Sequence, residues 1–410
     1  YRLLRIKIRA RQRALITSGA RFGKIALSVE IRTVTDIHQI GQAHWDKCAG
    51  PDNPFVSFGF LSAMEDSGST TAQTGWQPFH LVAEDDTGTV IGIVPLYVKG
   101  HSYGEYVFDW AWAEAYERAG GRYYPKLQSA VPFSPVPGPR LLVANDHPAP
   151  DQIRKTLIRG LAMLPEKLGM ATLHVTFCKR AESELMEQAG FLTRTGMQYH
   201  WHNRDYQNFD DFLAALNSRK RKNLRKERKQ VLEAGYSFRA LRGDDLKAEH
   251  WDRFYHFYHD TSDRKWGQAY LTRDFFDLLH ERMRDRTVLV CAYNDDEMVA
   301  GALNLIGSKT LYGRNWGTID RTPLLHFETC YYQAIDIAIE HGLETVEAGA
   351  QGEHKIQRGY EPVLTHSAHL IADPGLKRAV AQFLSQERDH IDQDRDFLLS
   401  EHTPYRRQEK

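Results

Sequence analysis

The residues best suited to chemistry lie in one short polar segment, residues 347–360, which reads EAGAQGEHKIQRGY. Carboxylate, carboxamide, imidazole, ammonium and guanidinium side chains crowd into it, directly after a predicted strand at 345–348. Side chains this polar are poor core material, and Gly349 and Gly352 let the backbone turn tightly or approach a ligand closely. The segment therefore predicts a place where a ligand is bound or reacts.

Amide formation from an activated acyl donor is a reaction that such groups could catalyse. The reaction needs a deprotonated amine, a polarised donor carbonyl and the orientation of one toward the other. We expect Glu353 or His354 to accept or relay the proton, since the ordinary pKa of an imidazole lies near neutrality. We place Glu347 with them in the catalytic set, and Glu347 and Gln351 could also position the amine.

The cations of the same segment suit an anion. Lys355 and Arg358 could bind a donor phosphate or an acceptor carboxylate, which a guanidinium holds through two parallel hydrogen bonds. The alternative is a structural ion-pair cluster of Glu347, Lys355 and Arg358 within a tight loop.

A second candidate site is rich in aromatic residues. The stretch 103–112 surrounds one acid with aromatic rings, and we expect it to form a groove wall for an acceptor, with Asp109 holding an ammonium group. Aromatic packing around a turn capped by Asp109 is the alternative. A rigid, proline-rich segment at 131–139 is expected to line the same cleft. The substrate-binding residues that we assign here and in the second half of the chain are Tyr103, Asp109, Trp110, Tyr124, Lys126, Asn315 and Trp316.

A basic segment lies between the two halves. Eight of the thirteen residues from 217 to 229 are Lys or Arg and one is acidic, within a helix expected over 209–234. Cations at this density bind phosphates of a nucleic acid or of a phosphorylated ligand, and the alternative is a solvated helix face. The expected phosphate-binding residues are Arg219, Lys220, Arg221, Lys222 and Arg225.

Composition limits the class of protein. The 410 residues are 42% hydrophobic and 26% charged with zero net charge, as in an ordinary globular chain of two or three domains. Any affinity for a polyanion must therefore come from a local patch. No apolar run is long enough for a membrane span, and four widely spaced cysteines favour reduced core thiols.

Metal binding is not expected. His200 and His202 have a spacing that could hold zinc on a strand, but no third ligand is evident, which favours a structural role. A pair of His326 and Glu328 on different sides of a helix is equally unsuited to a metal.

The N-terminal residues 1–29 carry eight Lys or Arg and no Asp or Glu. They resemble an organelle transit peptide, and the alternative is a basic, poorly ordered leader on a bacterial protein. We expect a disordered or targeting leader over 1–27, and a cytoplasmic protein, or an organellar one if the leader is a transit peptide.

The rest of the chain indicates one structural unit used twice. A helix, a β-hairpin and an aromatic-rich loop occur in each half, at a separation of about 210 residues. Strands that alternate with helices indicate a mixed sheet with helices on its faces. We predict a first domain over 28–203, a second over 204–373 that contains the basic helix, and a C-terminal helix and tail over 374–410.

Four runs of sequence resemble the FemAB-like family of predicted N-acyltransferases, which is labelled peptidoglycan biosynthesis or recognition. They are SYGEYVFDWAWA at 102–113, GRYYPKLQ at 121–128, SRKRKNLRKER at 218–228 and EAGAQGEHK at 347–355. The resemblance implies an α/β (α+β) fold of two tandem GNAT-like domains, each a mixed sheet flanked by helices, which holds an acyl donor.

The resemblance leaves the donor open. Fem transferases take an aminoacyl-tRNA and an amine of a lipid-linked peptidoglycan precursor, whereas GNAT enzymes use acyl-CoA. This chain has neither a clear Arg/Gln-x-x-Gly-x-Gly/Ala pyrophosphate loop nor the coiled-coil arm of some Fem proteins. We expect an N-acyltransferase with no tightly bound cofactor, an acyl-CoA or aminoacyl-tRNA co-substrate, a small-molecule or lipid-linked amine acceptor, and tRNA as a possible partner.

Two alternatives to an enzyme stay open. One is a non-catalytic protein that binds cell-wall precursors or RNA on a GNAT-like scaffold. The other is an adaptor whose basic helix docks on an anionic membrane.

Overall fold

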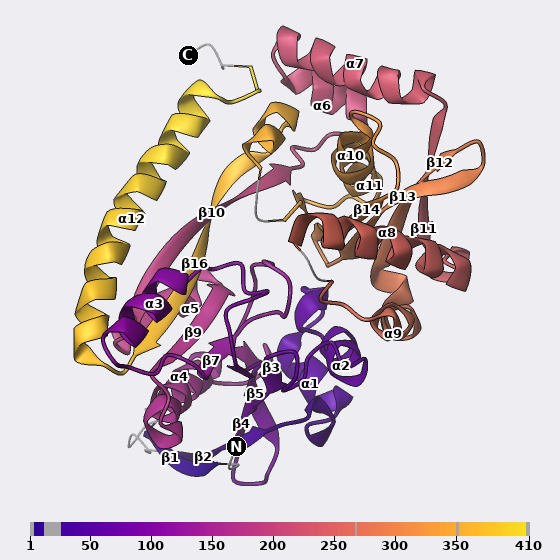
Figure 1. The fold of residues 1–410 in the computed structure, drawn as a ribbon. Helices are drawn as coiled ribbons and strands as arrows, with labels where there is room; N and C mark the ends of the chain where they lie inside the picture. The colour runs from indigo at the N-terminus through magenta and orange to yellow at the C-terminus, as the bar shows by residue number, and fades with distance from the viewer. Residues whose placement is uncertain (1–3, 12–25, 267–268, 350–351, 407–410) are drawn as a thin grey trace, which may run out of the picture.

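The computed structural model describes residues 4–11, 26–266, 269–349 and 352–406. Figure 1 shows most elements of the first half in the lower part of the molecule, most of those of the second half at the upper right, and the last helix, α12 (Pro374–Glu401), along one side. The strands form a five-stranded sheet and an eleven-stranded sheet.

The first unit runs strand, two helices, hairpin, strand, helix, strand. Its elements are β2 (Ala26–Val34), α1 (Gln42–Ala49), α2 (Phe58–Asp66), β3 (Trp76–Pro78), β4 (His80–Glu84), β5 (Val90–Val94), β6 (Tyr97–Lys99), α3 (Trp110–Arg118), β7 (Lys126–Ser129), β8 (Leu142–Val143), α4 (Pro150–Leu168), β9 (Thr172–Cys178), α5 (Arg180–Gln188) and β10 (Leu192–His202).

The second unit repeats this order. Its elements are α6 (Phe209–Ala215), α7 (Ser218–Glu233), β11 (Tyr236–Arg242), α8 (Ala248–Trp266), α9 (Arg273–Met283), β12 (Thr287–Asn294), β13 (Glu297–Ile306), β14 (Thr310–Thr318), α10 (Leu325–Phe327), the π-helical turn η5 (Glu328–Tyr332), α11 (Gln333–Glu340), β15 (Thr345–Glu347), the 3₁₀ helix η6 (Glu353–Arg358) and β16 (Glu361–Ile371). In each unit the strand after the hairpin pairs in parallel with the strand after the next helix, β7 with β9 and β14 with β15. The predicted tandem GNAT-like fold, with mixed sheets flanked by helices, is confirmed.

The last strand of each unit is exchanged. The large sheet has the order β11-β12-β13-β14-β15-β10-β16-β9-β7-β6-β3, so β10 of the first unit pairs with β15 and β16 of the second unit pairs with β9. The boundary that we expected at residue 203 falls directly after β10, and the exchange makes the eleven-stranded sheet continuous across the two units, while β2, β4, β5 and β8 stay in the five-stranded sheet.

Local sequence explains the helices that cover these sheets. Helix α4 begins with Pro150 in its first turn and ends before Gly169, whose φ of +65° closes the helix in the left-handed conformation. Its buried residues Ile153 and Leu157 recur at helical spacing and pack against Gly92 of β5. Side chains at these positions therefore fix α4 on the first-unit strands.

Helix α8 approaches β14 more closely than a side chain would allow. A Cβ on Gly317 would lie 2.5 Å from backbone atoms of Phe257 and Tyr258. Glycine at this position lets the helix backbone rest directly on the strand.

Two sequence expectations need correction. The helix expected over 209–234 is two helices, because Leu216 leaves the helix to bridge Tyr405 and Asn217 caps the next helix by accepting from the backbone N–H of Lys220. Within the basic leader, residues 5–11 form strand β1 (Arg5–Arg11), which pairs with β2. No helix in the described part of the chain combines the length and apolar character needed to span a membrane.

Candidate active site

Strand β14 is irregular where it leaves its neighbour β15. Its pairing with β13 shifts register so that Arg314 is the extra residue of a β-bulge. Its parallel pairing with β15 stops at Tyr312, although β14 continues to Thr318. Bulges of this kind re-aim groups beside active sites. We call this divergence the β14–β15 split; past it, the edge of β14 that faced β15 has no strand partner among the described residues.

A buried ion pair ties the two strands at the split. Arg314 Nη2 donates to Glu347 Oε2 at 2.9 Å, with the two side chains 7% and 9% exposed. Burial raises the pKa of Glu347 above its ordinary value, against the opposing pull of the Arg314 charge. The predicted catalytic Glu347 therefore holds the bulged residue in place.

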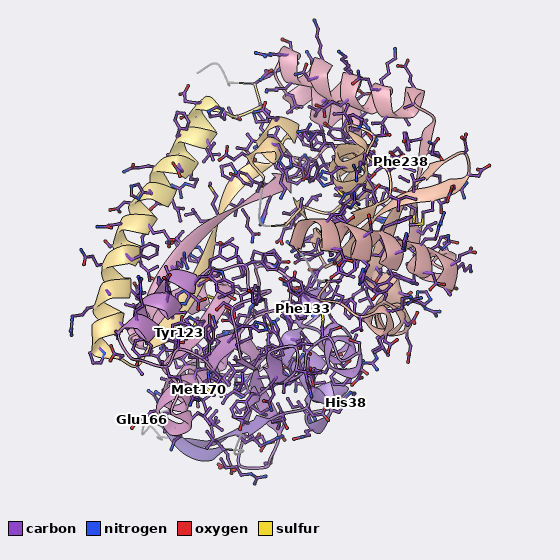
Figure 2. The ribbon with its side chains drawn as sticks, in the orientation of Figure 1. His38, Tyr123, Phe133, Glu166, Met170 and Phe238 are labelled. Atoms are coloured by element: carbon purple, nitrogen blue, oxygen red, sulfur yellow. The ribbon has the colours of Figure 1, made fainter. Side chains whose placement is uncertain are left out.

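A cavity of about 480 Å³ opens over the split, between the two units. The first unit contributes α2, the aromatic stretch 103–112 and the proline-rich segment 131–139. The second unit contributes α8, α9, β13 and β14. Figure 2 labels Phe133 near the middle of the molecule, where its ring stacks on that of Tyr270, with centroids 4.9 Å apart. Four predicted substrate-binding residues line this cavity: Tyr103, Trp110, Asn315 and Trp316.

Three further residues predicted to bind substrate, Asp109, Tyr124 and Lys126, do not line the cavity. Lys126 Nζ is buried and donates to Asp109 Oδ2 at 2.5 Å and to Glu105 Oε2 at 2.8 Å. Burial alone would raise the pKa of Asp109, but the Lys126 ammonium holds it well below its ordinary value. Tyr124 shares a hydrogen bond with Ser102 at 2.8 Å. The ammonium group expected at Asp109 is thus the chain's own Lys126.

Lys355 organises the loop that follows β15. It is 2% exposed, and its Nζ donates to the carbonyl oxygens of Ala348 at 2.7 Å and Gly349 at 3.0 Å. Burial, with the charge of Arg314 acting in the same direction, lowers the pKa of Lys355 to about 8. Gly349, with a φ of +80°, lies in the cavity wall.

Arg358 is engaged by the basic helix instead of standing in the cavity wall. Its Nη2 donates to Glu227 of α7 at 3.0 Å, and its guanidinium lies 3.4 Å from the ring centroid of Phe327. Glu227 also accepts from Tyr332 of the π-helical turn. Arg358 therefore joins η6 to α7 and α10, and Glu227 extends the link to η5.

The two proposed bases have different surroundings. His354 shares a hydrogen bond with the Tyr331 hydroxyl at 3.0 Å, and burial followed by the Arg358 charge lowers its pKa. Glu353 is exposed and does not line the cavity. Gln351 lies outside the described residues.

Sequence reasoning missed His326 as a candidate for acid–base chemistry. It lies in the first turn after β14, lines the cavity, and its ring centroid is 5.2 Å from that of Trp316 and 6.5 Å from that of His354. The signal was its place at a helix start ten residues after Trp316, but only the fold brings it to the split.

The predicted phosphate-binding residues lie on α7, mostly in its first turns. Arg219, Arg221 and Lys222 form no ion pair with any described residue, whereas Arg225 pairs with Asp210 at 2.9 Å. Burial, followed by the charges of Arg219 and Arg358, lowers the pKa of Lys220. The helix therefore begins with four consecutive cations, next to the segment that carries Arg358.

The corresponding split of the first unit is closed. Gly138, from the proline-rich segment, forms a parallel bridge to Cys178 at the end of β9. A separate cavity of about 630 Å³ lies beyond it, among the end of α1, the start of α4 and the end of β9. The open split of the second unit is therefore the stronger candidate for chemistry.

A metal site is not evident in the described residues. No group of three or more His, Cys, Asp or Glu side chains among them could hold a metal ion. The rings of His200 and His202 are 6.5 Å apart at their centroids.

The sequence model of the FemAB-like family, described as peptidoglycan biosynthesis/recognition, matches residues 36–407. No curated protein matches the chain. A solved structure of FemX is similar at a TM-score of 0.52 and 11% identity, over 85% of this chain and 99% of that chain. The C-terminal domain of a putative lysylphosphatidylglycerol synthetase from Agrobacterium fabrum is similar at 0.51 and 9% identity, over 84% and 96%. At such identities the likeness shows the fold.

Proposed function

Since the chain belongs to the FemAB-like family, we propose that it is an N-acyltransferase, which moves an acyl or aminoacyl group from a phosphate-bearing donor to an amine. The observation that carries the proposal is the bulged strand β14, which diverges from β15 above a cavity shared by both units. Diverging parallel strands leave backbone groups without ladder partners, so that N–H groups there can polarise a donor carbonyl.

The donor would reach the split from the side of α7. Four cations within the first five residues of α7 are repelled by the positive end of the helix macrodipole. A bound phosphate would relieve this repulsion and accept from the same side chains. Arg358 and Lys220 place this end of α7 against η6, which follows the loop of the cavity wall. We propose that the phosphates of an acyl-CoA or an aminoacyl-tRNA bind there.

We propose that the acceptor enters the cavity past the aromatic stretch 103–112. Tyr103 and Trp110 line the cavity and are 57% and 40% exposed, so their ring faces are open at its mouth. The family description supports an amine of a peptidoglycan precursor as the acceptor.

We assign proton transfer to His326, whose ring centroid lies 6.5 Å from that of His354. The amine nitrogen attacks the donor carbonyl carbon, the bond from that carbon to the carrier breaks, and the amine loses a proton. His326 lines the cavity, and a neutral imidazole can take that proton and return it to the departing sulfur or oxygen. Lys355, Glu347 and Arg314 position the strands and the loop around it.

The test is amide formation, followed by mass spectrometry, with acyl-CoA, acyl carrier protein and aminoacyl-tRNA donors and a panel of amines. We expect one donor class to support turnover and His326→Gln to lower kcat at least about 100-fold, as loss of a general base does. The same change at His390, which is exposed on α12, is the control and should leave kcat unchanged.

Two results would count against the proposal. Equal kcat for His326→Gln and the wild type would remove His326 from the chemistry. Binding without turnover for every donor would favour a non-catalytic protein that recognises cell-wall precursors or RNA.

A further inference from the structure

The lining of the cavity is largely apolar, its polar groups are mostly uncharged, and it carries almost no charge. Among the described residues that line it there is no Asp or Glu, and the cationic side chain of Arg314 is already paired with Glu347. Cavities of several hundred Å³ with this kind of lining take small ligands that are largely apolar.

One wall of the cavity is aliphatic and aromatic throughout. Side chains from α2, α9 and β13 meet there, and they are at most 4% exposed although they face an open space: Phe60, Met64, Phe275, Leu279, Leu303 and Leu305. Arg314, Asn315 and His326 lie at the split, and the other polar groups of the lining are mostly uncharged hydroxyls of Ser, Thr and Tyr side chains. The cavity thus has a polar edge at the reaction site and an apolar wall that begins on the neighbouring strand β13, where Leu303 pairs with Asn315.

The mouth of the cavity exposes large aromatic rings. Phe108 is 56% exposed and lies with Tyr103 on the loop that leads into α3, whose first residue is Trp110. Apolar side chains gathered in this way on a surface mark a binding groove.

This charge pattern distinguishes between the two donor classes. An aminoacyl group carries an ammonium next to its carbonyl, and a cation taken from water into an apolar site needs an anionic partner. The described lining offers none, and Arg314 has the same sign. A plain acyl group meets no such cost.

We infer, resting on the proposed function, that the donor carries an aliphatic acyl chain, which lies in this cavity with its carbonyl at the split. Since a water molecule takes about 30 Å³ of the liquid, a cavity of about 480 Å³ has room for roughly fifteen heavy atoms. The chain is therefore of medium length. The carrier bond of the thioester or ester breaks, the acyl carbon bonds to the amine nitrogen, and the proton passes to the carrier; nothing is oxidised or reduced.

Binding can be tested without turnover, by displacing the fluorescent probe N-phenyl-1-naphthylamine from the whole protein with 1-alkanols of two to fourteen carbons. We expect affinity to rise roughly fourfold for each methylene up to about ten to twelve carbons, since a buried methylene is worth about 0.8 kcal/mol. 2-Amino-1-decanol, which adds one ammonium, should bind at least about tenfold more weakly than 1-decanol.

Variants locate the site. Leu303→Phe fills space beside the apolar wall and should weaken 1-dodecanol at least about tenfold while leaving 1-hexanol unchanged. Trp110→Ala, at an exposed position that folding tolerates, should weaken the long alkanols several-fold. Phe397→Ala removes an aromatic ring that is 56% exposed on α12, outside the cavity, and should change nothing.

The outcomes separate this inference from the catalytic proposal. No uptake of the probe, or equal binding of 1-decanol and 2-amino-1-decanol, would overturn the aliphatic assignment even if an aminoacyl donor supported turnover. The expected alkanol profile without transfer from any donor would uphold an aliphatic ligand in the cavity and defeat the catalytic proposal.

Discussion

The charged residues around the β14–β15 split are buried, and each is held by a specific partner. Arg314 and Glu347 hold each other across the split, and Lys355 is held by two backbone carbonyls. Buried charges are costly unless they are paired. Their roles can therefore be separated by how stability responds when one partner or one proton is removed.

The Lys355 ammonium makes stability depend on pH. Its folded-state pKa of about 8 lies below the ordinary 10.5, so the unfolded chain binds more protons between these values and the contribution to stability rises with pH there. Between pH 8 and 10.5 the wild type should gain up to about 3 kcal/mol relative to Lys355→Met. Urea unfolding of both proteins at several pH values measures this gain.

The control for this prediction is Lys167→Met, the same chemical change at an exposed position on α4. Its difference from the wild type should stay constant over that range. A constant difference for Lys355→Met as well would show that burial does not destabilise the Lys355 ammonium.

The Arg314–Glu347 pair predicts non-additive mutations. Arg314→Gln leaves Glu347 buried without its cation and should lower the free energy of unfolding by about 3 kcal/mol. The double variant with Glu347→Gln should recover part of that loss because no charge stays buried alone. Additive losses in urea unfolding would mean that the two side chains do not depend on each other.

Among the elements, α7 is the one whose charge has no structural explanation near its start. Arg219 and Lys222 are exposed and form no ion pair with a described residue, whereas Lys229 near the other end pairs with Glu233 at 3.4 Å. Substitutions at exposed positions of this kind alter the free energy of unfolding by less than about 0.5 kcal/mol. A change in donor binding in such a variant can therefore be assigned to the lost charge and not to unfolding.

Neutralising Arg219 and Lys222 to Gln should raise KM for the phosphate-bearing donor about tenfold, and less at high salt because screening weakens the attraction. Steady-state kinetics at two salt concentrations measures this, with Lys229→Gln as the matched control. An unchanged KM in the double variant would mean that the start of α7 is a solvated helix surface that does not bind the donor.

The elements also show what the sequence could and could not predict. Local signals predicted a helix and a hairpin in each half and the basic segment, because caps, turns and periodic apolar residues lie close together in the chain. The break at Asn217 had a local signal, its capping side chain, that the charge pattern of the segment obscured. The place of His326 at a helix start was visible in the sequence, but its position at the cavity was not, because the split and the aromatic stretch 103–112 meet only through long-range packing.

At the scale of the whole molecule, the exchange of β10 and β16 joins the units. Strand β10 of the first unit pairs with β15 of the second, and β16 of the second unit pairs with β9 of the first. Across the β9–β16 pair, His174 and His369 lie buried with their Nδ1 atoms 2.7 Å apart. Sequence periodicity predicted two similar units but not this exchange, because strand pairing over such separations leaves no local pattern.

The shared sheet predicts that the chain unfolds in one cooperative step. Calorimetry should give a single transition whose calorimetric and van't Hoff enthalpies agree. Two resolved transitions, one for each unit, would show that the exchanged strands do not couple them.

The central claim is that acyl transfer takes place at the β14–β15 split. The most direct measurement is a crystal structure of the wild-type protein with a ketone analogue of decanoyl-CoA, in which a methylene replaces the thioester sulfur. We predict its ketone oxygen within about 2.7–3.2 Å of a backbone N–H of β14 beyond Tyr312, and its chain toward Leu303 and Leu305. An analogue bound instead in the first-unit cavity between α1 and α4, with the split empty, would contradict the account.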